Sequence, residues 1–337
     1  MNLQRHFNLQ AYNTFGITAY CDYFVEITTV AELLEIINNE TLKAFPVLIL
    51  GGGSNLLFTQ DFKGLVIKNS IKGIELVKED EQHVWLKSYS GEVWHHLVQY
   101  AIAHNYGGIE NLSLIPGQVG AAPMQNIGAY GVEIESVFDS LEAIDLQTGT
   151  TRIFTKSECN FGYRESIFKK EAKGKYCIVS VTFKLNKQPV FNTSYGAIQD
   201  TLQQMNATPS VKTISEAVVQ IRTSKLPDPK VLGNAGSFFK NPEIAKEQFL
   251  QLQQQYPTIP HYPAADNKIK VPAGWLIEQC GWKGKRVGNT GSHAQQALVL
   301  VNYGNATGEE IKNLSQQIQQ SVEEKFGIAL TAEVNFV

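Results

Sequence analysis

The sequence predicts an α+β fold with two or three domains. Segments with helical spacing of apolar residues alternate with short strand-like runs along the whole chain. A turn signal, Thr148-Gly149, separates two strand-like runs at 136–146 and 151–155, which is typical of a β-hairpin. A length of 337 residues is enough for more than one hydrophobic core.

The first part of the chain is expected to be rich in strands. Thr29 and Glu32 form a capping-box pattern, and the apolar residues that follow at 33, 34, 36 and 37 predict an amphipathic helix. A second helix is expected over 93–104. Alternating or continuous apolar runs predict strands at 47–50, 65–68, 83–88 and 178–185.

The pattern changes after Pro189. A helix is expected over 215–222, and the prolines of 225–229 must end it. Glycine, proline and aromatic residues are more frequent over 230–300, and 219–319 is expected to form a separate domain. The elements expected in this part are helices at 244–255 and 273–280, a strand at 297–301, a helix that Thr307 and Glu310 cap and that ends before Gly327, and a strand at 330–337.

Composition excludes several classes of function. The net charge of −3 shows no basic excess for nucleic acid or anionic lipid. The four cysteines lack Cys-x-x-Cys spacing and the seven histidines lack metal-ligand spacing, so we expect reduced thiols and no metal. The chain opens with no apolar signal segment, and no apolar run approaches transmembrane length. We therefore expect a cytoplasmic protein without membrane insertion.

The most informative segment is 47–55, in which a short apolar strand runs into Gly-Gly-Gly-Ser-Asn. Glycines let backbone N–H groups approach a bound anion, and Ser54 and Asn55 add hydrogen-bond donors. Leu56 stands where a dinucleotide fingerprint starting at Gly51 needs its last glycine, and no Gly-Lys-Ser/Thr follows. The loop therefore favours a nucleotide held by neither a Rossmann unit nor a P-loop, although a plain turn has the same pattern.

Three further segments have unusual compositions. Segment 115–131 carries four glycines, two prolines and three alanines without periodicity, as expected for backbone packed closely against a ligand or for a buried loop between domains. Arg164 lies among aromatic and apolar residues, where it either pairs structurally or binds a carboxylate or phosphate. Ser237 lies between a glycine and two phenylalanines but not in a Gly-x-Ser-x-Gly elbow, which disfavours hydrolase chemistry.

Taken in order, these segments resemble the UDP-N-acetylenolpyruvoylglucosamine reductase (MurB) family of peptidoglycan synthesis over nearly the whole chain. Ala-Pro-Met-Gln-Asn-Ile at 122–127 and Tyr195 in Ser-Tyr-Gly resemble the type I subgroup, which closes a tyrosine-bearing loop over its substrate. The matching motifs are Asn-Thr-Phe-Gly at 13–16, 51–58, 115–131, Gly-Tyr-Arg-Glu-Ser at 162–166, Arg222 with Lys-Leu-Pro-Asp-Pro at 225–229, Gly-Ser-Phe-Phe-Lys-Asn-Pro at 236–242, Pro-Ala-Gly-Trp-Leu-Ile-Glu at 272–278, and Gln-Ala-Leu-Val-Leu at 296–300.

The resemblance implies a two-part FAD-binding region of the vanillyl-alcohol-oxidase (PCMH) type and a smaller α+β substrate-binding domain. The implied parts are FAD-binding subdomains at 1–70 and 71–218, a substrate-binding domain at 219–319, and a C-terminal segment at 320–337 that returns to the FAD-binding region. The residues implied to bind FAD are Asn13, Thr14, Gly51, Gly52, Gly53, Ser54, Asn55, Pro116, Gly117, Gly120, Ala121, Gln125, Asn126, Gly128, Ala129, Tyr130 and Arg222.

The implied reaction is NADPH-dependent reduction of UDP-N-acetylglucosamine enolpyruvate to UDP-N-acetylmuramate, a step of cell-wall synthesis needed for cell shape and division. Hydride passes through FAD to C3 of the enol ether, and Ser237 gives a proton to C2. Arg164 and Glu333 stabilise the charge that develops on the substrate carboxylate. Lys240 is a candidate for assisting the proton transfer, because a serine is a poor acid in water.

The family match also assigns the substrate contacts Tyr195, Lys225, Asn241 and Gln296. The partners implied are a small-molecule substrate and NADPH, and we expect a monomer that binds no nucleic acid. The usual C-terminal motif Leu-Glu-x-Glu-Val departs here to Leu-Thr-Ala-Glu-Val at 330–334. It keeps the catalytic Glu333 and replaces the first acid by Thr331, which we expect to lie behind the site residues or at the surface.

Two alternatives remain open from the sequence. The first is a flavin-dependent oxidase of the same superfamily. Many such oxidases tether the flavin through histidine or cysteine, and the glycine loop contains neither. The second is a nucleotide-binding module without enzymatic activity, which explains the glycine loop but leaves Arg164, Ser237 and Glu333 without a function.

Overall fold

The computed structural model describes residues 2–337, which form two compact units interleaved along the chain. Unit 1 comprises the N-terminal residues up to Phe7, Cys21–Gly52 and Lys63–Ser224. Unit 2 comprises Asn8–Tyr20, Gly53–Phe62 and Lys225–Val337. Both contain helices and mixed or antiparallel sheets, which confirms the α+β class. The functional boundaries expected at 70, 218 and 319 stay a prediction.

The first sheet of unit 1 leads into the glycine loop. Its strand order is β1-β2-β5-β3, and β3 pairs with β5 in parallel, so that Leu50 lies opposite Lys68. The apolar face of α1 packs on this sheet through Leu33 and Ile36, and Thr29 and Glu32 form the predicted capping box. The bounds are β1 Gln4–Asn8, β2 Tyr20–Ile27, α1 Val30–Ile37, β3 Val47–Leu50 and β5 Phe62–Asn69.

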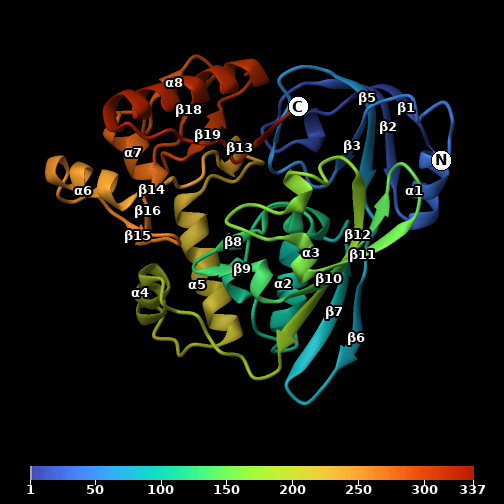
Figure 1. Ribbon diagram of the computed structural model, residues 1–337, viewed down its shortest axis with the longest axis horizontal. Helices are drawn as coiled ribbons and strands as arrows, with labels where there is room; N and C mark the ends of the chain where they lie inside the picture. Colours follow the sequence, from blue (N-terminus) through green and yellow to red (C-terminus); the bar gives the residue numbers. More distant parts are fainter. Residues whose placement is uncertain (1) are drawn as a thin grey trace. The chain divides into compact units, whose positions relative to one another are not determined.

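The second sheet of unit 1 is antiparallel and has the order β11-β10-β12-β7-β6. Figure 1 shows α2 and α3 against one of its faces, and Trp94 and Leu97 of α2 belong to the same buried core as Phe183 of β12. The predicted hairpin is confirmed, since β10 and β11 pair across it. The bounds are β6 Ile74–Glu79, β7 His83–Tyr89, α2 Trp94–Ala103, β10 Phe138–Asp145, β11 Thr151–Thr155, α3 Lys156–Cys159 and β12 Tyr176–Asn186.

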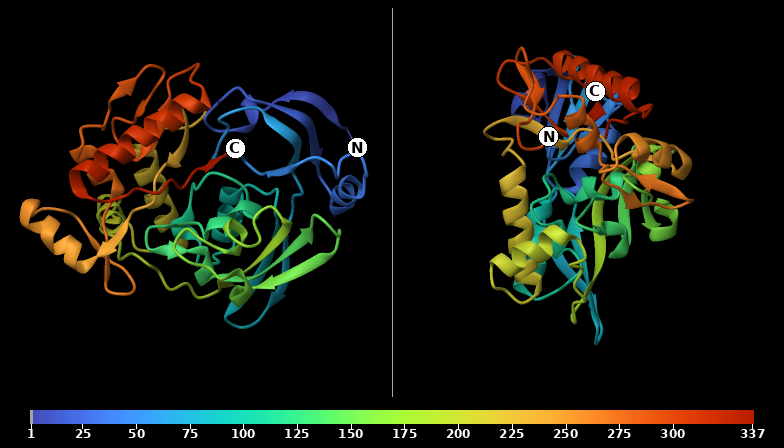
Figure 2. Two further views of the ribbon diagram at one scale, coloured as in Figure 1. Left: turned by 45° about the horizontal axis from the view of Figure 1, so that its top comes forward. Right: turned by 90° about the vertical axis from the view of Figure 1, so that its left-hand side faces the viewer.

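The rest of unit 1 consists of short turns and two helices. Ile198 of α4 packs with Ile214 and Val218 of α5, which Figure 2 shows in gold with α4 beside it. Helix α5 ends at Lys225, as the following prolines predict. The bounds are the 3-10 turns Glu110–Leu112, Val119–Gln125, Ile134–Ser136 and Ile167–Lys169, the two-stranded pair β8 Gly128–Ala129 and β9 Val132–Glu133, and the helices α4 Gly196–Gln204 and α5 Val211–Lys225.

Unit 2 is organised around the sheet β13-β19-β18-β17, on which α8 packs through Ile311, Leu314 and Ile318 (Figure 1). Helix α8 is capped by Thr307 and ends at Gly327, as predicted. The bounds are the 3-10 turn Gln10–Tyr12, β4 Leu56–Leu57, β13 Gly233–Ser237, β14 Glu243–Ala245, α6 Lys246–Gln255, β15 Tyr262–Pro263, β16 Lys268–Lys270, α7 Ala273–Gln279, β17 Arg286–Val287, β18 Thr290–Ser292, β19 Val299–Asn302, α8 Gly308–Phe326 and β20 Asn335–Phe336.

Two expected elements of unit 2 differ from the structure. The helix expected from 244 begins at Lys246, because Glu243–Ala245 pairs with β16 as strand β14. The strand expected over 330–337 is reduced to β20, which pairs in parallel with β4. Residues 331–333 instead run beside 238–240 with few ladder bonds, so that an extended segment lies where a full strand was expected.

Candidate active site

In unit 1 the glycine loop lies against a second loop that carries predicted cofactor residues. A methyl group added at Gly52 would lie 3.1 Å from the Cα atom of Gly117, and one at Gly51 would lie 3.2 Å from the Gln118 side-chain oxygen. Backbone therefore packs on backbone here, and a side chain at Gly52 would push the two loops apart. This contact brings Gly51 and Gly52 together with the predicted residues Pro116, Gly117, Gly120 and Ala121.

A lysine lies beside these two loops. Lys68 Nζ donates to the carbonyl of Asn69 at 3.1 Å and to Gln118 Oε1 at 3.3 Å, and Gln118 Nε2 donates in turn to the carbonyl of Gly91 at 2.9 Å. Burial lowers the pKa of Lys68, whereas the nearby Glu26 carboxylate raises it. A cation next to glycine-rich backbone is chemically suited to hold an anion.

The glycine loop continues into unit 2 at Gly53, where a turn at 12–14 covers it. Gly53 has φ +62°, and a side chain there would overlap the carbonyl of Tyr12. Thr14 donates to the carbonyl of Gly53 from its backbone N at 3.1 Å and from Oγ1 at 3.4 Å. Asn13 instead uses its amide inside its own turn, donating to the carbonyls of Leu9 and Ile17 at 2.9 Å each. Thr14 is thus the member of this pair that hydrogen-bonds the loop, whereas Asn13 contacts it only through its backbone.

The segment around Asn126 is held by buried side-chain hydrogen bonds. Asn126 is fully buried and has the left-handed backbone φ +44°. Its Nδ2 donates to Glu133 at 2.9 Å and to the carbonyl of Gly162 at 3.2 Å, while its Oδ1 accepts from the N–H of Glu135 at 3.0 Å. The predicted residues Gln125, Gly128 and Ala129 lie in the turn that these bonds shape.

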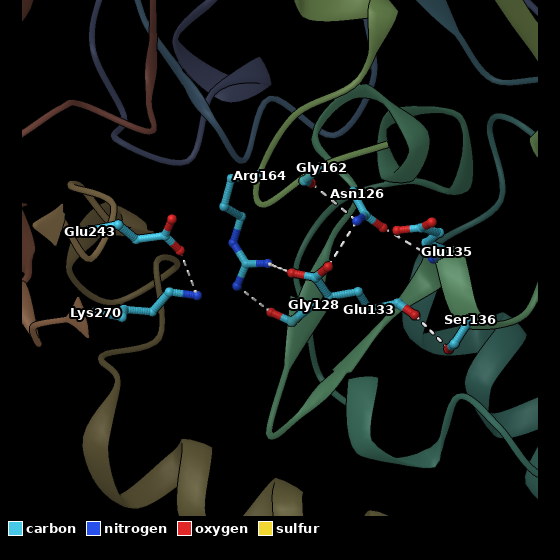
Figure 3. A network of polar contacts seen from close by, with 9 residues as sticks. All are labelled: Asn126, Gly128, Glu133, Glu135, Ser136, Gly162, Arg164, Glu243 and Lys270. Carbon is cyan, nitrogen blue, oxygen red and sulfur yellow. Dashed lines mark hydrogen bonds and ion pairs between the residues drawn. The ribbon is translucent and has the colours of Figure 1, made fainter. Parts of the chain in front are cut away.

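Arg164 points into the same network, as Figure 3 shows. Its Nη2 donates to the carbonyl of Gly128 at 2.6 Å, and Nη1 lies 3.5 Å from Glu133 Oε1. The side chain is 18% exposed, and its backbone has φ +56°. The turn at 128–133 therefore fixes the orientation of the Arg164 guanidinium. Part of the side chain is exposed to solvent.

Tyr130, Arg222 and Tyr195 form a second cluster in unit 1. The Tyr130 hydroxyl hydrogen-bonds Arg222, and burial raises the pKa of Tyr130 while the arginine lowers it. Burial also lowers the pKa of Arg222, whose Nε is buried without a hydrogen-bond partner among the described residues. The ring of Tyr195, 39% exposed, meets the ring of Tyr130 edge-on, with centroids 5.3 Å apart.

In unit 2 backbone pairing brings Ser237 and Glu333 close together. The N–H of Phe238 bonds to the carbonyl of Leu298, and the N–H of Glu333 bonds to the carbonyl of Phe238, both at 2.8 Å. Phe239 then pairs with Ala332, which sets Phe238 opposite Glu333 and leaves Ser237 one residue along from that position. Ser237 is exposed and Glu333 is half-buried.

The remaining predicted residues of unit 2 either make hydrogen bonds with neighbouring backbone or are exposed. Ser54 and Asn55 follow Gly53, and Asn55 Nδ2 donates to the carbonyl of Glu333 at 3.2 Å. Asn241 Oδ1 accepts from the N–H of Ala273 at the start of α7, at 2.9 Å. Gln296 turns its amide toward Leu298 and Gly274. Lys225 is exposed at the end of α5, and Thr331 is exposed beside Lys240.

These residues fit a flavin dinucleotide. The glycine loop is a cradle that a Cβ atom would fill, and Lys68 lies beside it. Arg222 keeps a buried N–H without a partner among the described residues, as expected for a donor that a ligand completes. The glycine loop, the 116–131 segment and Arg222 are accordingly the residues that would hold FAD.

Sequence reasoning missed some residues that support the site. His95 Nδ1 accepts from the N–H of Leu114 at 3.0 Å, just before the 116–121 loop. Leu114 has φ +58°. Asn111, buried at 1% exposure, donates to the carbonyl of Tyr130. A lone histidine or asparagine between apolar residues carries no pattern that reports such a contact.

A groove of about 1030 Å³ between α2 and α5 contains none of the predicted site residues; its lining includes His95, Ile102 and Val219. Within residues 2–337, no three histidine, cysteine or acidic side chains gather as a metal site. No helix in the described part of the chain is long and apolar enough to cross a membrane.

Two family models match the chain. One, described as the C-terminal domain of UDP-N-acetylenolpyruvoylglucosamine reductase, matches residues 228–337. The other, described as an FAD binding domain, matches residues 21–155. The second match confirms the FAD-binding region that the glycine loop and its neighbours predict.

Similar proteins cover the full length. The UDP-N-acetylenolpyruvoylglucosamine reductase of Flavobacterium johnsoniae is 53% identical over 340 residues and that of Amoebophilus asiaticus is 52% identical over 338, with 100% of each chain covered. The crystal structure of the reductase from Thermus caldophilus has a TM-score of 0.71 at 23% identity and covers 100% of this chain and 99% of its own, which supports the fold. The chain belongs to the UDP-N-acetylenolpyruvoylglucosamine reductase family.

Proposed function

We propose that the chain is an FAD-containing oxidoreductase that reduces UDP-N-acetylglucosamine enolpyruvate to UDP-N-acetylmuramate in peptidoglycan synthesis, with NADPH as reductant. The observation that carries the proposal is the backbone pairing in unit 2 that places the segment of Ser237 alongside the segment of Glu333, on a chain of this family. Reduction of an enol ether needs a hydride donor and a proton donor. The exposed Ser237 hydroxyl is the candidate for the second.

FAD, when bound, supplies the transfer of hydride from NADPH to the enol ether. The chain's part is to hold the cofactor. Gly51 to Asn55 and the 116–121 segment would hold the diphosphate through backbone N–H groups, with Lys68 beside them. Arg222 and Tyr130 would complete their hydrogen bonds on the cofactor.

Arg164 and Glu333 polarise the substrate carboxylate in this proposal. Reduction at C3 puts negative charge on C2 and its carboxylate, so the fixed cation Arg164 lowers the barrier, and Glu333 contributes as a neutral acid that donates a hydrogen bond. Removing such a stabiliser typically costs roughly 10²–10³ in rate. Arg164 is suited to this because Gly128 and Glu133 fix its planar fork before substrate arrives.

Ser237 gives the proton to C2. Its hydroxyl is exposed and its backbone is fixed by the pairing of 237–239 with 299 and 332. General acid catalysis contributes roughly 10²–10⁴ in rate. Lys240, three residues on, is the nearby cation that we assign to assist the transfer, because a serine hydroxyl is a weak acid.

The substrate contacts proposed are Tyr195, Lys225, Asn241 and Gln296, with the tyrosine and lysine on the uridine-diphosphate part, as in the type I subgroup. Tyr195 and Lys225 are exposed at ends of helices, where they can reach a ligand. We propose a cytoplasmic monomer that binds this nucleotide sugar and NADPH, and no nucleic acid, because the net charge of −3 shows no basic excess.

An anaerobic stopped-flow measurement tests the function. NADPH is mixed with the purified flavoprotein, and UDP-N-acetylglucosamine enolpyruvate is added while the yellow flavin band is followed. We expect bleaching by NADPH and rapid recovery with the substrate. A band that recovers only with air would support an oxidase, and a colourless protein would contradict the flavoenzyme assignment.

A further inference from the structure

Asn111 is a buried asparagine that joins two segments of unit 1. Its Nδ2 donates to the carbonyl of Tyr130 at 3.1 Å and to the carbonyl of Asn192 at 2.9 Å. These two acceptors lie 62 residues apart along the chain. The first belongs to the turn at 128–131, and the second to the loop that leads to Tyr195.

Asn192 makes the reciprocal contact. Its Nδ2 donates to the carbonyl of Gly131 at 3.0 Å, and its Oδ1 accepts from the N–H and the hydroxyl of Ser194 at 3.2 and 2.7 Å. The turn at 128–131 and the loop at 192–195 are thus joined by two asparagine side chains. The contact continues outward to the rings of Tyr130 and Tyr195.

Asn111 projects from a firmly anchored part of the chain. The Trp94 indole donates to the carbonyl of Leu112 at 2.9 Å, and the Ser113 hydroxyl bonds to Ser215 of α5 at 2.7 Å. The two acceptor segments have no strand longer than two residues and depend on side-chain bonds for their shape. A fixed donor therefore sets the place of two irregular segments.

The amide is retained at a cost. Asn111 Oδ1 is buried and has no hydrogen-bond partner among the described residues. Burying an oxygen without a hydrogen-bond partner is unfavourable, so an apolar residue at this position would lower the stability of the fold less. The two donated bonds are what an apolar residue could not replace.

We propose that Asn111 is a positioning residue that holds the Tyr195-bearing loop at the Tyr130 turn, so that Tyr195 meets the nucleotide-sugar substrate in the right place. The inference rests on the proposed function of Tyr195 as a substrate contact. Asn111 itself touches neither substrate nor cofactor in this proposal. It acts through the carbonyls of Tyr130 and Asn192.

Asn111→Asp gives the sharpest test, because it keeps the shape and exchanges donors for acceptors. At neutral or higher pH the carboxylate faces two carbonyl oxygens and repels both. We expect the KM for UDP-N-acetylglucosamine enolpyruvate to rise by at least about tenfold, because the loss of one hydrogen bond alone produces a change of that size and two are lost here. The kcat at saturating substrate should change little.

A pH profile separates positioning from a general loss of structure. As the pH falls, the protonated carboxyl regains one donor and one of the two bonds. The ratio of the KM of Asn111→Asp to that of the wild type should therefore shrink toward acid, whereas the ratio for Asn111→Ala should stay constant. A ratio for the aspartate variant that is equal at all pH values would contradict the proposal.

Hydrogen exchange gives a readout that needs no activity. Amides of 190–196 should exchange faster in Asn111→Asp by about tenfold, while those of 116–121 stay unchanged. Asn105→Asp makes the same chemical change on an exposed side chain six residues earlier and serves as the matched control. Unchanged exchange in 190–196 would overturn the proposal even if the substrate assignment were correct.

A double-mutant cycle ties the effect to Tyr195. Asn111→Asp and Tyr195→Phe should be non-additive in the KM for the nucleotide sugar, and Asn105→Asp with Tyr195→Phe should be additive. Additive effects for both pairs would contradict the proposal.

If Asn111→Asp does not fold, Asn192→Ala removes the reciprocal bond from a less buried position and must raise the same KM and the same exchange rates. If the wild type does not turn over this substrate, the proposed function fails while the exchange experiment still decides the positioning role.

Discussion

The two units hold the residues proposed for the active site in different ways. In unit 1, Asn126, Tyr130 and Arg164 all have left-handed backbones with φ between +44° and +56°, and side chains bond to nearby carbonyls to keep them there. In unit 2, Ser237 and Glu333 lie on extended segments that backbone bonds join. In unit 1 the hydrogen bonds of side chains determine the backbone conformation. In unit 2 the hydrogen bonds of the backbone determine where the side chains lie.

The difference predicts which substitutions damage what. A side chain that only projects from paired backbone can be changed with little loss of stability. A side chain that holds a left-handed turn cannot be changed in this way. A non-glycine residue in that conformation costs roughly 1–2 kcal/mol, and the polar groups that lose their hydrogen-bond partner add to this cost. Substitutions in unit 2 should therefore lower activity and leave the free energy of unfolding nearly unchanged. Substitutions in unit 1 should lower both.

The largest effect is expected for Ser237→Ala. Recovery of the bleached flavin by the enolpyruvyl substrate should slow by roughly 10²–10⁴, because the proton donor is lost. Bleaching by NADPH and the melting temperature should stay near wild type. Rapid single-turnover absorbance measures both half-reactions, and Ser321→Ala on α8 is the control. Equal loss in both half-reactions would remove the acid role from Ser237.

Glu333→Gln should slow the same half-reaction by roughly 10²–10³. Its backbone N–H and carbonyl, which bond to Phe238 and Asn55, do not change, so the free energy of unfolding should be preserved. Urea titration and turnover measured on one preparation test this, with the exposed Glu323→Gln as the control. A large fall in stability would show that the Glu333 side chain, and not only its backbone, supports unit 2.

Asn126→Ala should lower the free energy of unfolding by about 3 kcal/mol. It leaves the N–H of Glu135 without this partner, removes the bonds to Glu133 and to the carbonyl of Gly162, and keeps the strained backbone. Asn160→Ala, which has the same φ of +44° but an exposed side chain, should cost about 1 kcal/mol. Chemical denaturation compares the two. Equal losses would show that backbone strain, and not the buried bonds, sets the cost in unit 1.

The smallest effect is a pH dependence from His95. Burial lowers its pKa, and the positive charges of His96 and Arg222 lower it further. The unfolded chain therefore takes up this proton first, so stability is full above the ordinary histidine pKa of 6.5 and declines below it. Glu216 and Lys212 line the groove that His95 faces, and both remain in every variant.

His95→Gln should flatten this decline, because the glutamine oxygen can still accept from Leu114 but does not titrate. Melting temperatures between pH 5 and 8 measure the slope. His96→Gln, whose side chain is 62% exposed, should reduce the slope only slightly, because burial is the larger cause of the lowered pKa of His95. A slope that survives in His95→Gln would assign the acid sensitivity to another group.

Much of the fold could be predicted from local sequence signals. Helix α8 has its cap at Thr307 and its stop at Gly327, and both ends are where the capping pattern predicts. The hairpin of β10 and β11 was also predicted correctly, from the turn signal Thr148-Gly149. The helix expected from 244 began late, because pairing of Glu243–Ala245 with β16 is a contact between distant residues that outweighs local propensity.

The site could be predicted in part. The glycine loop is visible as a pattern, but its closeness to Gly117 depends on tertiary packing. The roles of Arg164, Ser237 and Glu333 were predicted only through the family resemblance, since each is a single polar residue in a mixed segment. The bonds of Asn111 and His95 to backbone carbonyls and amides leave no trace in the sequence, because the partner atoms are the same in every residue.

The pairing of β4 with β20 has a consequence for synthesis in the cell. Leu56 and Leu57 find their partners only at Asn335 and Phe336, and the carbonyl of Val337 accepts from Thr59, 278 residues earlier. At a ribosomal speed of 5–20 residues per second this separation takes roughly 15–60 seconds to translate. Throughout that time the early segments of unit 2 stay exposed, and a nascent chain that stalls before residue 335 leaves a strand edge open to chaperones or to aggregation.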